Sequence, residues 1–403
     1  MTRGRLIFVF LSLATVVFLV SGSILAVAES RQSDDGDDSF YKSLAIFTEV
    51  LSLVQRAYVD ETETDSLISG AYEGVVDALD PFSLYVPADQ VAAFEANRTA
   101  GVGRSGLLVL KERGVAFAVA VEEGSPAAQA GIERSDILSM IQGKRTRPMP
   151  LFEIRTILAG APGTVVKLET YRQGRRREVE LVLADYPRPG VRLEERKGVG
   201  VLRLAAFHAG TPKDVELALT TLESGTPELP GLSAKDRLLI DLRGVAGGDE
   251  RVAYGVAGLF ATGELGTLAA RQSPVEVFQS GDEPRWQGRV AILIDRGTQG
   301  PAEILATVLK QKTDAALVGD RSFGYAGRQE LVRLSNGGLL QITDAFYTGP
   351  DRQPINDSLE PDLRVREDFV GLDEENQPPG DTILEQGLDL LLEEEEVEEK
   401  LAA

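Results

Sequence analysis

The chain has 403 residues, enough for two or three domains with their own hydrophobic cores, and 43% of its residues are hydrophobic. Its formal net charge of −21 argues against nucleic-acid binding, because no basic surface could easily dominate that background. The sequence has no cysteine, which excludes disulfides, thiolate metal sites and cysteine nucleophiles. It also contains no metal-ligand cluster and no phosphate-binding loop, so we expect no metal and no cofactor.

The N-terminus has the pattern of an export signal. Basic residues precede an apolar run from Leu6 to Val20, and Ala26-Val27-Ala28 supplies a small-x-small cleavage site. The apolar stretch is long enough to span a bilayer if it is not cleaved. We therefore predict a signal peptide or membrane anchor at residues 1–28 and an acidic linker at 29–39. The protein would then lie in the bacterial cell envelope, in the periplasm or on the outer face of the inner membrane.

Residues 40–99 follow a helical pattern. Apolar residues recur at spacings of three and four, for example at Leu44, Phe47 and Leu51. A turn that stops a helix is then expected at Asp80, which a proline follows, with aromatic residues nearby as anchors. This part of the chain is predicted to be an N-terminal helical region.

Residues 101–186 contain several short predicted strands around one longer helix. Val115–Val121 alternates as a strand, Ser125 opens a short helix, and Leu151–Leu158 predicts the longer helix. This order resembles a PDZ domain. Domains of that kind bind the C-terminus of a peptide by adding it to a sheet as a strand, while backbone N–H groups hold its carboxylate.

The PDZ resemblance implies a peptide-binding loop at Ser105, Gly106, Leu107 and Leu108, ahead of the short helix. The usual alternation of glycine and hydrophobic residues is imperfect there, because Arg104-Ser105 replaces its first half. Two interpretations stay open. The domain binds protein or peptide C-termini, or it serves only as a packing module.

Strands and helices alternate across residues 190–365, as in an α/β core. Buried strands are predicted at Val199–Leu204, Leu238–Arg243 and Val290–Asp295, and the last of these leads into a helix at Ala302–Lys312. The other predicted elements of this region are a helix at Thr211–Glu223 and strands at Ala316–Gly319 and Leu339–Ala345.

The C-terminal residues 366–403 are rich in glutamate, especially from Glu393 onward. We expect a short helix there with a solvated end rather than an interaction tail. The sequence as a whole predicts a multidomain α/β protein with an N-terminal helical region, a PDZ domain and an α/β core.

Several motifs, in the right order, resemble those of the C-terminal processing (tail-specific) peptidases. Asp80–Tyr85 is similar to the family segment Asp-Pro-His-Ser-x-Tyr, with Phe82 in place of the histidine. Asp241–Gly248 is similar to Asp-Leu-Arg-Asn-x-Pro-Gly-Gly, and Val318–Gly324 to Val-Gly-Glu-x-Thr-Phe-Gly. The resemblance extends from about Phe40 to about Leu392. It implies that residues 190–365 form an α/β peptidase-like core, and that the family's activity is that of a serine-type peptidase with a lysine base.

The resemblance places residues without the family's chemistry at its catalytic positions. The family nucleophile is the middle serine of Gly-Ser-Ala-Ser-Ala-Ser-Glu, and aligning that glutamate with Glu303 puts Gly300 at the nucleophile. The family base is the lysine of Phe-Gly-Lys-Gly, and aligning Phe323-Gly324 puts Tyr325 at the base. Gln329 falls on the family's glutamine. Tyr325 follows Gly300 by 25 residues, a separation that also fits the family.

The region expected to hold the oxyanion is altered as well. By resemblance, one donor would be a backbone N–H of the Gly247-Gly248 pair, and another would be the N–H of the residue after the nucleophile. That residue is Pro301, which has no N–H. Nucleophile, base and one oxyanion donor are therefore missing together. A tyrosine, with an ordinary pKa of about 10, is a poor substitute for an unprotonated amine at neutral pH.

Catalysis could have moved to another hydroxyl, and Thr298 is the fallback nucleophile, two residues before Gly300. The remaining candidates have simpler explanations. Lys310 and Lys312 are an exposed pair late on a helix, Ser322 is a turn residue, and His208 is a polar loop residue. Structural salt bridges or caps explain Asp241, Arg243 and Glu303.

These observations favour an exported pseudopeptidase that binds protein C-terminal tails, or a partner, without cleaving them. The partner could be an active peptidase relative or a second copy of the chain. The membrane would be contacted only through the N-terminal segment. Two alternatives stay open: an active serine- or threonine-type processing peptidase with a relocated nucleophile, and a purely structural envelope protein.

Overall fold

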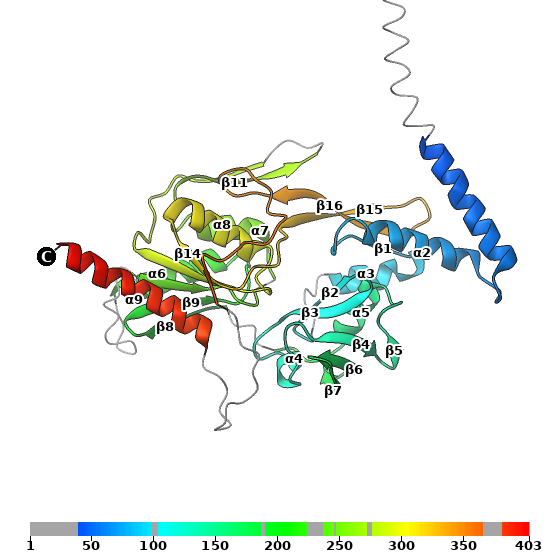
Figure 1. Ribbon diagram of the computed structural model, residues 1–403, viewed down its shortest axis with the longest axis horizontal. Coiled ribbons are helices and arrows are strands. Elements are labelled where there is room, and N and C mark those ends of the chain that lie inside the picture. The colour runs from blue at the N-terminus through cyan, green and yellow to red at the C-terminus, as the bar shows by residue number, and fades with distance from the viewer. Residues whose placement is uncertain are drawn as a thin grey trace, which may run out of the picture. The chain divides into compact units, whose positions relative to one another are not determined.

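The computed structural model (Figure 1) describes residues 39–98, 104–186, 190–224, 237–245, 247–271, 276–365 and 381–402. The predicted signal or anchor at 1–28 and nearly all of the predicted linker lie outside the described residues. No helix in the described part of the chain is long and apolar enough to cross a membrane. The chain divides into two compact units, Met1–Tyr72 and Glu73–Ala403.

The N-terminal unit is helical, as its apolar spacing predicts. A helix spans residues 39–57, and α2 (Thr64–Asp77) begins in the same unit. Many apolar side chains of the first helix are exposed, among them Phe40, Leu44 and Phe47. Gln55 donates a hydrogen bond of 2.6 Å to the Thr64 hydroxyl and so links the first helix to the start of α2.

The segment after α2 forms a strand inside the region predicted to be helical. The Asp80 carboxylate accepts hydrogen bonds of 2.8 Å from the backbone N–H groups of Phe82 and Ser83, which makes a tight turn and stops the helix. The strand β1 (Leu84–Val86) then pairs antiparallel with a strand of the core, β16 (Leu339–Tyr347). Two short helical elements follow, η1 (Ala88–Gln90) and α3 (Val91–Arg98). The turn matters for function because it places Phe82 beside the core.

The PDZ region has the predicted strands and helices. Its sheet has the order β2-β3-β4-β6-β7, with β5 paired to β4, so β2 is an edge strand. The elements are β2 (Leu107–Glu112), β3 (Val115–Val121), α4 (Pro126–Gln129), β4 (Ile137–Ile141), β5 (Lys144–Arg145), α5 (Leu151–Leu158), β6 (Val165–Arg172) and β7 (Arg175–Val182). Ser125 caps α4 by accepting the Ala128 N–H, as expected for a serine before a helix.

The core is built on a six-stranded sheet in the order β17-β14-β13-β10-β9-β8, parallel except for β8. Its strands are β8 (Val191–Arg196), β9 (Val199–Leu204), β10 (Arg237–Asp241), β13 (Arg289–Ile294), β14 (Ala316–Gly319) and β17 (Leu363–Arg364). The helices packed with it are α6 (Thr211–Ser224), α7 (Glu250–Ala257), α8 (Pro301–Thr313) and α9 (Thr382–Ala402).

Alternation along the central strands gives the core three layers. Successive side chains of a strand point to opposite faces of its sheet. Leu202, Ile240 and Ile292 pack into one hydrophobic cluster with α6, α7 and α8, whereas Leu239 and Leu293 pack into another with α9. The parallel strands are buried on both faces, and for that reason they read as continuous apolar runs in the sequence.

A second sheet of the core was not predicted as such. It has the order β1-β16-β11-β12, with β15 paired to β16. The strands β11 (Gly263–Ala270), β12 (Glu276–Ser280) and β15 (Gly327–Arg333) join β1 and β16. Since β15 begins two residues after Tyr325 and β1 begins two residues after Phe82, this sheet brings those two side chains to the same place.

The C-terminal helix α9 is longer than the short helix predicted from the sequence, at 21 residues. Its buried residues Ile383, Leu384, Leu388 and Leu391 cover one face of the central sheet. Gly387 allows a close approach, because a Cβ there would lie 2.7 Å from a methyl carbon of Leu293. The helix is therefore part of the core.

We predict that Leu388→Ala destabilises the core by about 2–5 kcal/mol, because the side chain is fully buried between α9 and the sheet. The measurement is urea denaturation. Leu217→Ala, at a side chain that is 66% exposed on α6, serves as the control and should change the free energy of unfolding by less than about 0.5 kcal/mol. Equal effects of the two substitutions would contradict the placement of α9.

Candidate functional site

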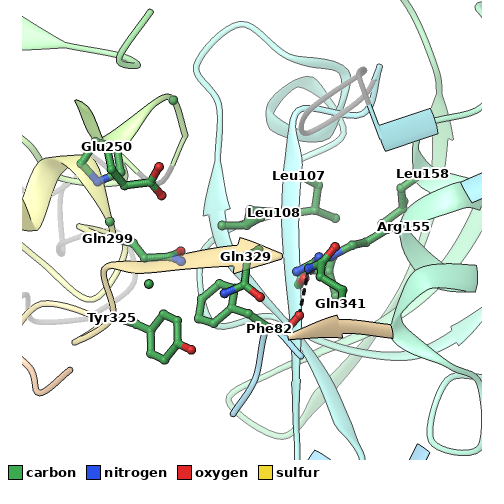
Figure 2. A pocket seen from close by; sticks show the side chains of 15 residues that line it. Phe82, Leu107, Leu108, Arg155, Leu158, Glu250, Gln299, Tyr325, Gln329 and Gln341 are labelled. Carbon is green, nitrogen blue, oxygen red and sulfur yellow. Dashed lines mark hydrogen bonds between the residues drawn. The ribbon is translucent and has the colours of Figure 1, made fainter. Parts of the chain in front are cut away.

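A cavity of about 250 Å³ lies where loops at the carboxyl ends of β10 and β13 meet the PDZ strand β2 and helix α5 (Figure 2). From the core it is lined by Gly248, Glu250, Gln299, Gly300, Tyr325 and Gln329. From the PDZ domain it is lined by Leu107, Leu108, Val109, Arg155 and Leu158. The carboxyl ends of parallel strands are the usual place for ligand sites in open α/β sheets.

Gly300 forms the turn between the loop after β13 and helix α8. Its φ of 56° and ψ of −113° lie in a region that L side chains rarely adopt, and Pro301 then starts the helix. A Cβ at Gly300 would nonetheless find room, because its nearest atoms would be Glu250 Oε1 at 3.8 Å and the Tyr325 carbonyl oxygen at 4.0 Å. The position therefore has the sharp strand-to-helix turn on which nucleophilic serines are displayed, without a side chain.

Glu303 holds the two candidate catalytic segments together. Its buried carboxylate accepts hydrogen bonds from the backbone N–H groups of Gly300 at 3.1 Å, Gly324 at 2.5 Å and Tyr325 at 2.8 Å. It also accepts a short hydrogen bond from the Ser322 hydroxyl. Burial raises the pKa of Glu303 to about 7, and these four hydrogen bonds oppose the rise. The structural role predicted for Glu303, and the turn role predicted for Ser322, agree with these contacts.

The tyrosine at the family's base position belongs to an aromatic cluster. Its ring stacks on Phe82, with ring centroids 4.4 Å apart and planes 21° apart, and meets the edge of Phe346 at 5.5 Å. Phe323 meets the edge of Phe82 at 5.8 Å. Burial raises the pKa of Tyr325 above its usual value. The ring therefore fills this part of the site with a neutral, largely buried phenol.

Gln329 lies next to Tyr325 through a shared threonine. Gln329 Nε2 donates to Thr343 Oγ1 at 2.7 Å, and the same hydroxyl makes a short hydrogen bond with the Tyr325 hydroxyl. The carbonyl oxygen of the Gln329 side chain is buried and has no partner among the described residues. Gln329 thus lies beside the position of the family's base, but the group it helps to orient there is a phenol and not an amine.

The glycine pair after β10, predicted to form an oxyanion loop, reaches the cavity through Gly248. Gly248 lines the cavity and has a φ of 130°. A Cβ there would lie 2.3 Å from the Phe207 carbonyl oxygen, so only glycine fits. The Gly247 carbonyl accepts the Phe207 N–H at 3.1 Å and thereby fixes the loop. Opposite it, Pro301 lines the cavity without an N–H to donate.

Thr298, the fallback nucleophile, is fully buried and does not line the cavity. Its hydroxyl donates to the Leu242 carbonyl at 2.9 Å and accepts the Asp295 N–H at 3.0 Å. The first contact fastens the loop after β13 to the segment after β10, and the second closes a turn within the loop after β13. This is the environment of a structural hydroxyl, and it gives Thr298 no access to a substrate in the cavity.

The other residues considered from the sequence also have structural contacts. Asp241 pairs with Arg243, and Arg243 also pairs with Asp381 at 2.7 Å. Lys310 pairs with Asp362 at 2.6 Å, and His208 is exposed in a loop. Among the described residues no group of acidic, histidine or cysteine side chains could hold a metal ion.

The predicted peptide-binding loop turns sharply at Gly106, and its last two residues, Leu107 and Leu108, begin the edge strand β2. A Cβ at Gly106 would lie 2.1 Å from the Ser125 Cβ, and the residue has a φ of 70°. Ser105 is buried, and its hydroxyl accepts the Leu107 N–H at 3.2 Å. Leu107 and Leu108 line the cavity, so this end of the PDZ groove opens toward Gly300.

Two charged residues of the cavity were not singled out from the sequence. Arg155 on α5 donates from Nε to the Val109 carbonyl at 3.3 Å, and burial lowers its pKa to about 10. Glu250 begins α7, and burial raises its pKa to about 7. The sequence offered one indication that Glu250 belongs to the site, its position two residues after Gly248. Helical spacing alone could not show that Arg155 faces this cavity.

Comparisons with known proteins agree with this architecture. Residues 198–365 match the model of peptidase family S41, and residues 117–172 match the model of the PDZ domain. A carboxy-terminal-processing protease of Bartonella bacilliformis is 28% identical over 366 residues, which cover 87% of this chain and 82% of the relative. The carboxy-terminal processing protease CtpA of Bacillus subtilis is 26% identical over 348 residues, covering 85% and 72%.

A solved structure, that of a photosystem II D1 C-terminal processing protease, superposes with a TM-score of 0.62 at 22% identity. The match covers 82% of this chain and 95% of that one. It establishes the fold that the two share.

We predict that Glu303→Ala lowers the free energy of unfolding by about 3–5 kcal/mol, because four buried donors lose their acceptor at once. Chemical denaturation measures the loss. The control is Glu330→Ala, at an exposed position of β15, for which a change below about 0.5 kcal/mol is expected. If Glu303→Ala were as mild as its control, the carboxylate would not be what joins the two segments.

A second prediction follows from the raised pKa of Glu250. Between its ordinary value of 4.5 and about 7, the folded chain binds a proton that the unfolded chain releases. The free energy of unfolding of the wild type should therefore fall as the pH rises through this window. Glu250→Gln lacks this contribution, so the variant should gain stability relative to the wild type as pH increases. Parallel pH profiles in denaturation experiments would show that Glu250 does not titrate there.

Proposed function

Because the chain combines a peptidase family S41 domain with a PDZ domain, we propose that it is a pseudopeptidase that binds protein C-terminal tails without cleaving them. The names of its relatives, carboxy-terminal processing proteases, support the tail as the ligand. The observation that carries the loss of cleavage is the joint presence of Gly300, Pro301 and Tyr325 in the wall of one cavity.

The chemistry of the family requires three parts in that cavity. A hydroxyl must attack the peptide carbonyl, an amine must take its proton, and N–H groups must hold the resulting oxyanion. Gly300 provides no hydroxyl and Pro301 no N–H. The Tyr325 phenol, with its pKa raised by burial, stays protonated at neutral pH and so cannot accept the proton. The buried contacts of Thr298 count against a relocated nucleophile.

The binding half of the proposal rests on the PDZ domain. Strand β2 is at the edge of its sheet, so a tail can add to it as a further strand with its carboxylate at the Ser105–Leu108 loop. The cavity then continues from Leu107 and Leu108 to Gly300, which allows residues upstream of the carboxylate to occupy the former catalytic cleft. The tail would be held where a peptidase cuts it.

One contact favours the alternative of a purely structural protein. Arg155 Nε donates to the Val109 carbonyl of β2, so it occupies one acceptor on the edge that a tail would need. A tail must displace this 3.3 Å hydrogen bond to pair along the whole strand. Whether it does so is decided by a direct binding measurement.

Export to the bacterial envelope is part of the proposal, supported by the apolar run from Leu6 to Val20. Partners that fit the proposal are the C-terminal tails of exported proteins. An active peptidase relative or a second copy of the chain could also bind, since a pseudopeptidase can regulate by co-assembly.

The test of binding uses a short, unstructured, fluorescently labelled peptide with a free C-terminal carboxylate. We expect the full chain to raise its fluorescence anisotropy, and chromatography to recover the peptide intact. A C-terminally amidated peptide and the groove variant Leu108→Asp should each weaken binding by about tenfold or more. Equal affinity for free and amidated peptides, or no binding of either, would contradict tail recognition.

A further prediction concerns restoration of activity. Gly300→Ser, Pro301→Ala, Tyr325→Lys and Phe82→His together return the residues that the family carries. The serine would fit, at a strain of about 1–3 kcal/mol from its backbone conformation. We expect tail cleavage to appear in this variant and not in a matched one that retains Tyr325. If the restored variant folds and binds the tail but does not cleave it, this result would contradict the claim that the rest of the catalytic frame is intact.

A further inference from the structure

Glu250 places a carboxylate at the point of the cavity where the family nucleophile would act. A Cβ on Gly300 would lie 3.8 Å from Glu250 Oε1. In Figure 2 the carboxylate points from the first turn of α7 toward the middle of the cavity, with the Gln299 amide and the Tyr325 ring below it. Glu250 is therefore positioned to touch a bound tail beside Gly300.

Among the described residues, the only hydrogen-bond donor to this carboxylate is the backbone N–H of Glu250 itself. Within the part of the chain that the structure describes, no ion pair and no side-chain hydrogen bond reaches it, unlike the charged residues on either side. Asp249 accepts the Arg251 N–H at 2.9 Å as the cap of α7, and Arg251 pairs with Glu276 at 2.9 Å. A partly buried charge without a counterion is costly, and a cation supplied by a ligand would compensate for it.

Gln299, Gln329 and Pro301 also line the cavity. The side-chain carbonyl oxygens of Gln299 and Gln329 are buried and have no partner among the described residues. Gln299 is only 7% exposed. Pro301, which lines the same end, has no N–H. An oxyanion site needs N–H donors, whereas this end of the cavity has the Glu250 carboxylate and a proline that cannot donate.

The opposite end of the cavity has the opposite charge. Arg155 and Leu158 of α5 line it, with Leu107 and Leu108 between the two ends (Figure 2). A positive side chain is disfavoured near the Arg155 guanidinium and favoured near Glu250. The two charges would thus restrict both the type of side chain that binds near Glu250 and its position along the tail.

From this geometry we infer that Glu250 makes the former catalytic cleft a subsite for one basic side chain, lysine or arginine, of the bound tail. The inference rests on the proposed tail binding and defines which tails are selected. The ammonium or guanidinium group would pair with the Glu250 carboxylate. Glu250 acts here as a specificity-determining residue, since no bond in the tail is broken.

The test measures dissociation constants of the full chain for a series of labelled, free-carboxylate peptides. Each peptide carries a single lysine, methionine or glutamate, placed at successive positions upstream of the C-terminus. At one position lysine should bind about tenfold more tightly than methionine, and glutamate more weakly than either. Glu250→Gln should remove the lysine preference, so that the lysine and methionine peptides bind with similar affinity. Glu250→Lys should favour the glutamate peptide.

The control is Glu283→Gln, which removes the same charge from an exposed position outside this cavity. It should keep the full lysine preference, which separates a local pairing from attraction to a chain of net charge −21. A lysine preference that survives Glu250→Gln, or tight binding of all peptides without preference, would overturn the subsite and leave tail binding in place. Failure of every peptide to bind would refute the proposed function itself.

Discussion

The buried carboxylate of Glu303 is the interaction on which the site depends. It accepts hydrogen bonds from the backbone N–H of Gly300 on one side and from those of Gly324 and Tyr325 on the other. It therefore joins the start of α8 to the segment before β15. Three of its four donors are main-chain groups. The two segments therefore stay in place whichever side chains occupy positions 300 and 325, so the proposed loss of the reactive groups would leave this frame intact.

The substitutions in this frame fit one another physically. Glycine relieves the strain of the backbone conformation at position 300, and it leaves an open surface there. Tyr325 stacks on Phe82, which stands where the family has histidine, so two replacements from distant segments fill one volume. Glu250 adds a charge that an oxyanion site would exclude, because it would repel the developing negative charge. Each change suits a site that holds a peptide more than one that cleaves it.

Much of the fold could be predicted from the sequence. The central strands β9, β10, β13 and β14 are buried on both faces and appear as apolar runs, and the PDZ elements follow clear alternation. The strands β11 and β12, and likewise β15 and β16, pair with their neighbours in the sequence, but the sheet that joins them depends on the long-range pairing of β1 and β11 with β16, which no local pattern records. Motif spacing brought Gly300, Tyr325 and Gln329 together correctly. Glu250 and Arg155 were missed because their roles arise only when the two domains enclose the cavity.

The most direct measurement mixes an unstructured free-carboxylate peptide with an excess of the purified protein and follows the peptide by mass spectrometry. An excess of protein reveals even a single slow turnover per chain. The account predicts that the peptide stays intact while it co-purifies with the protein. Cleavage products that form at a rate proportional to protein concentration, and that persist in Thr298→Ala, would contradict the loss of catalysis at this site.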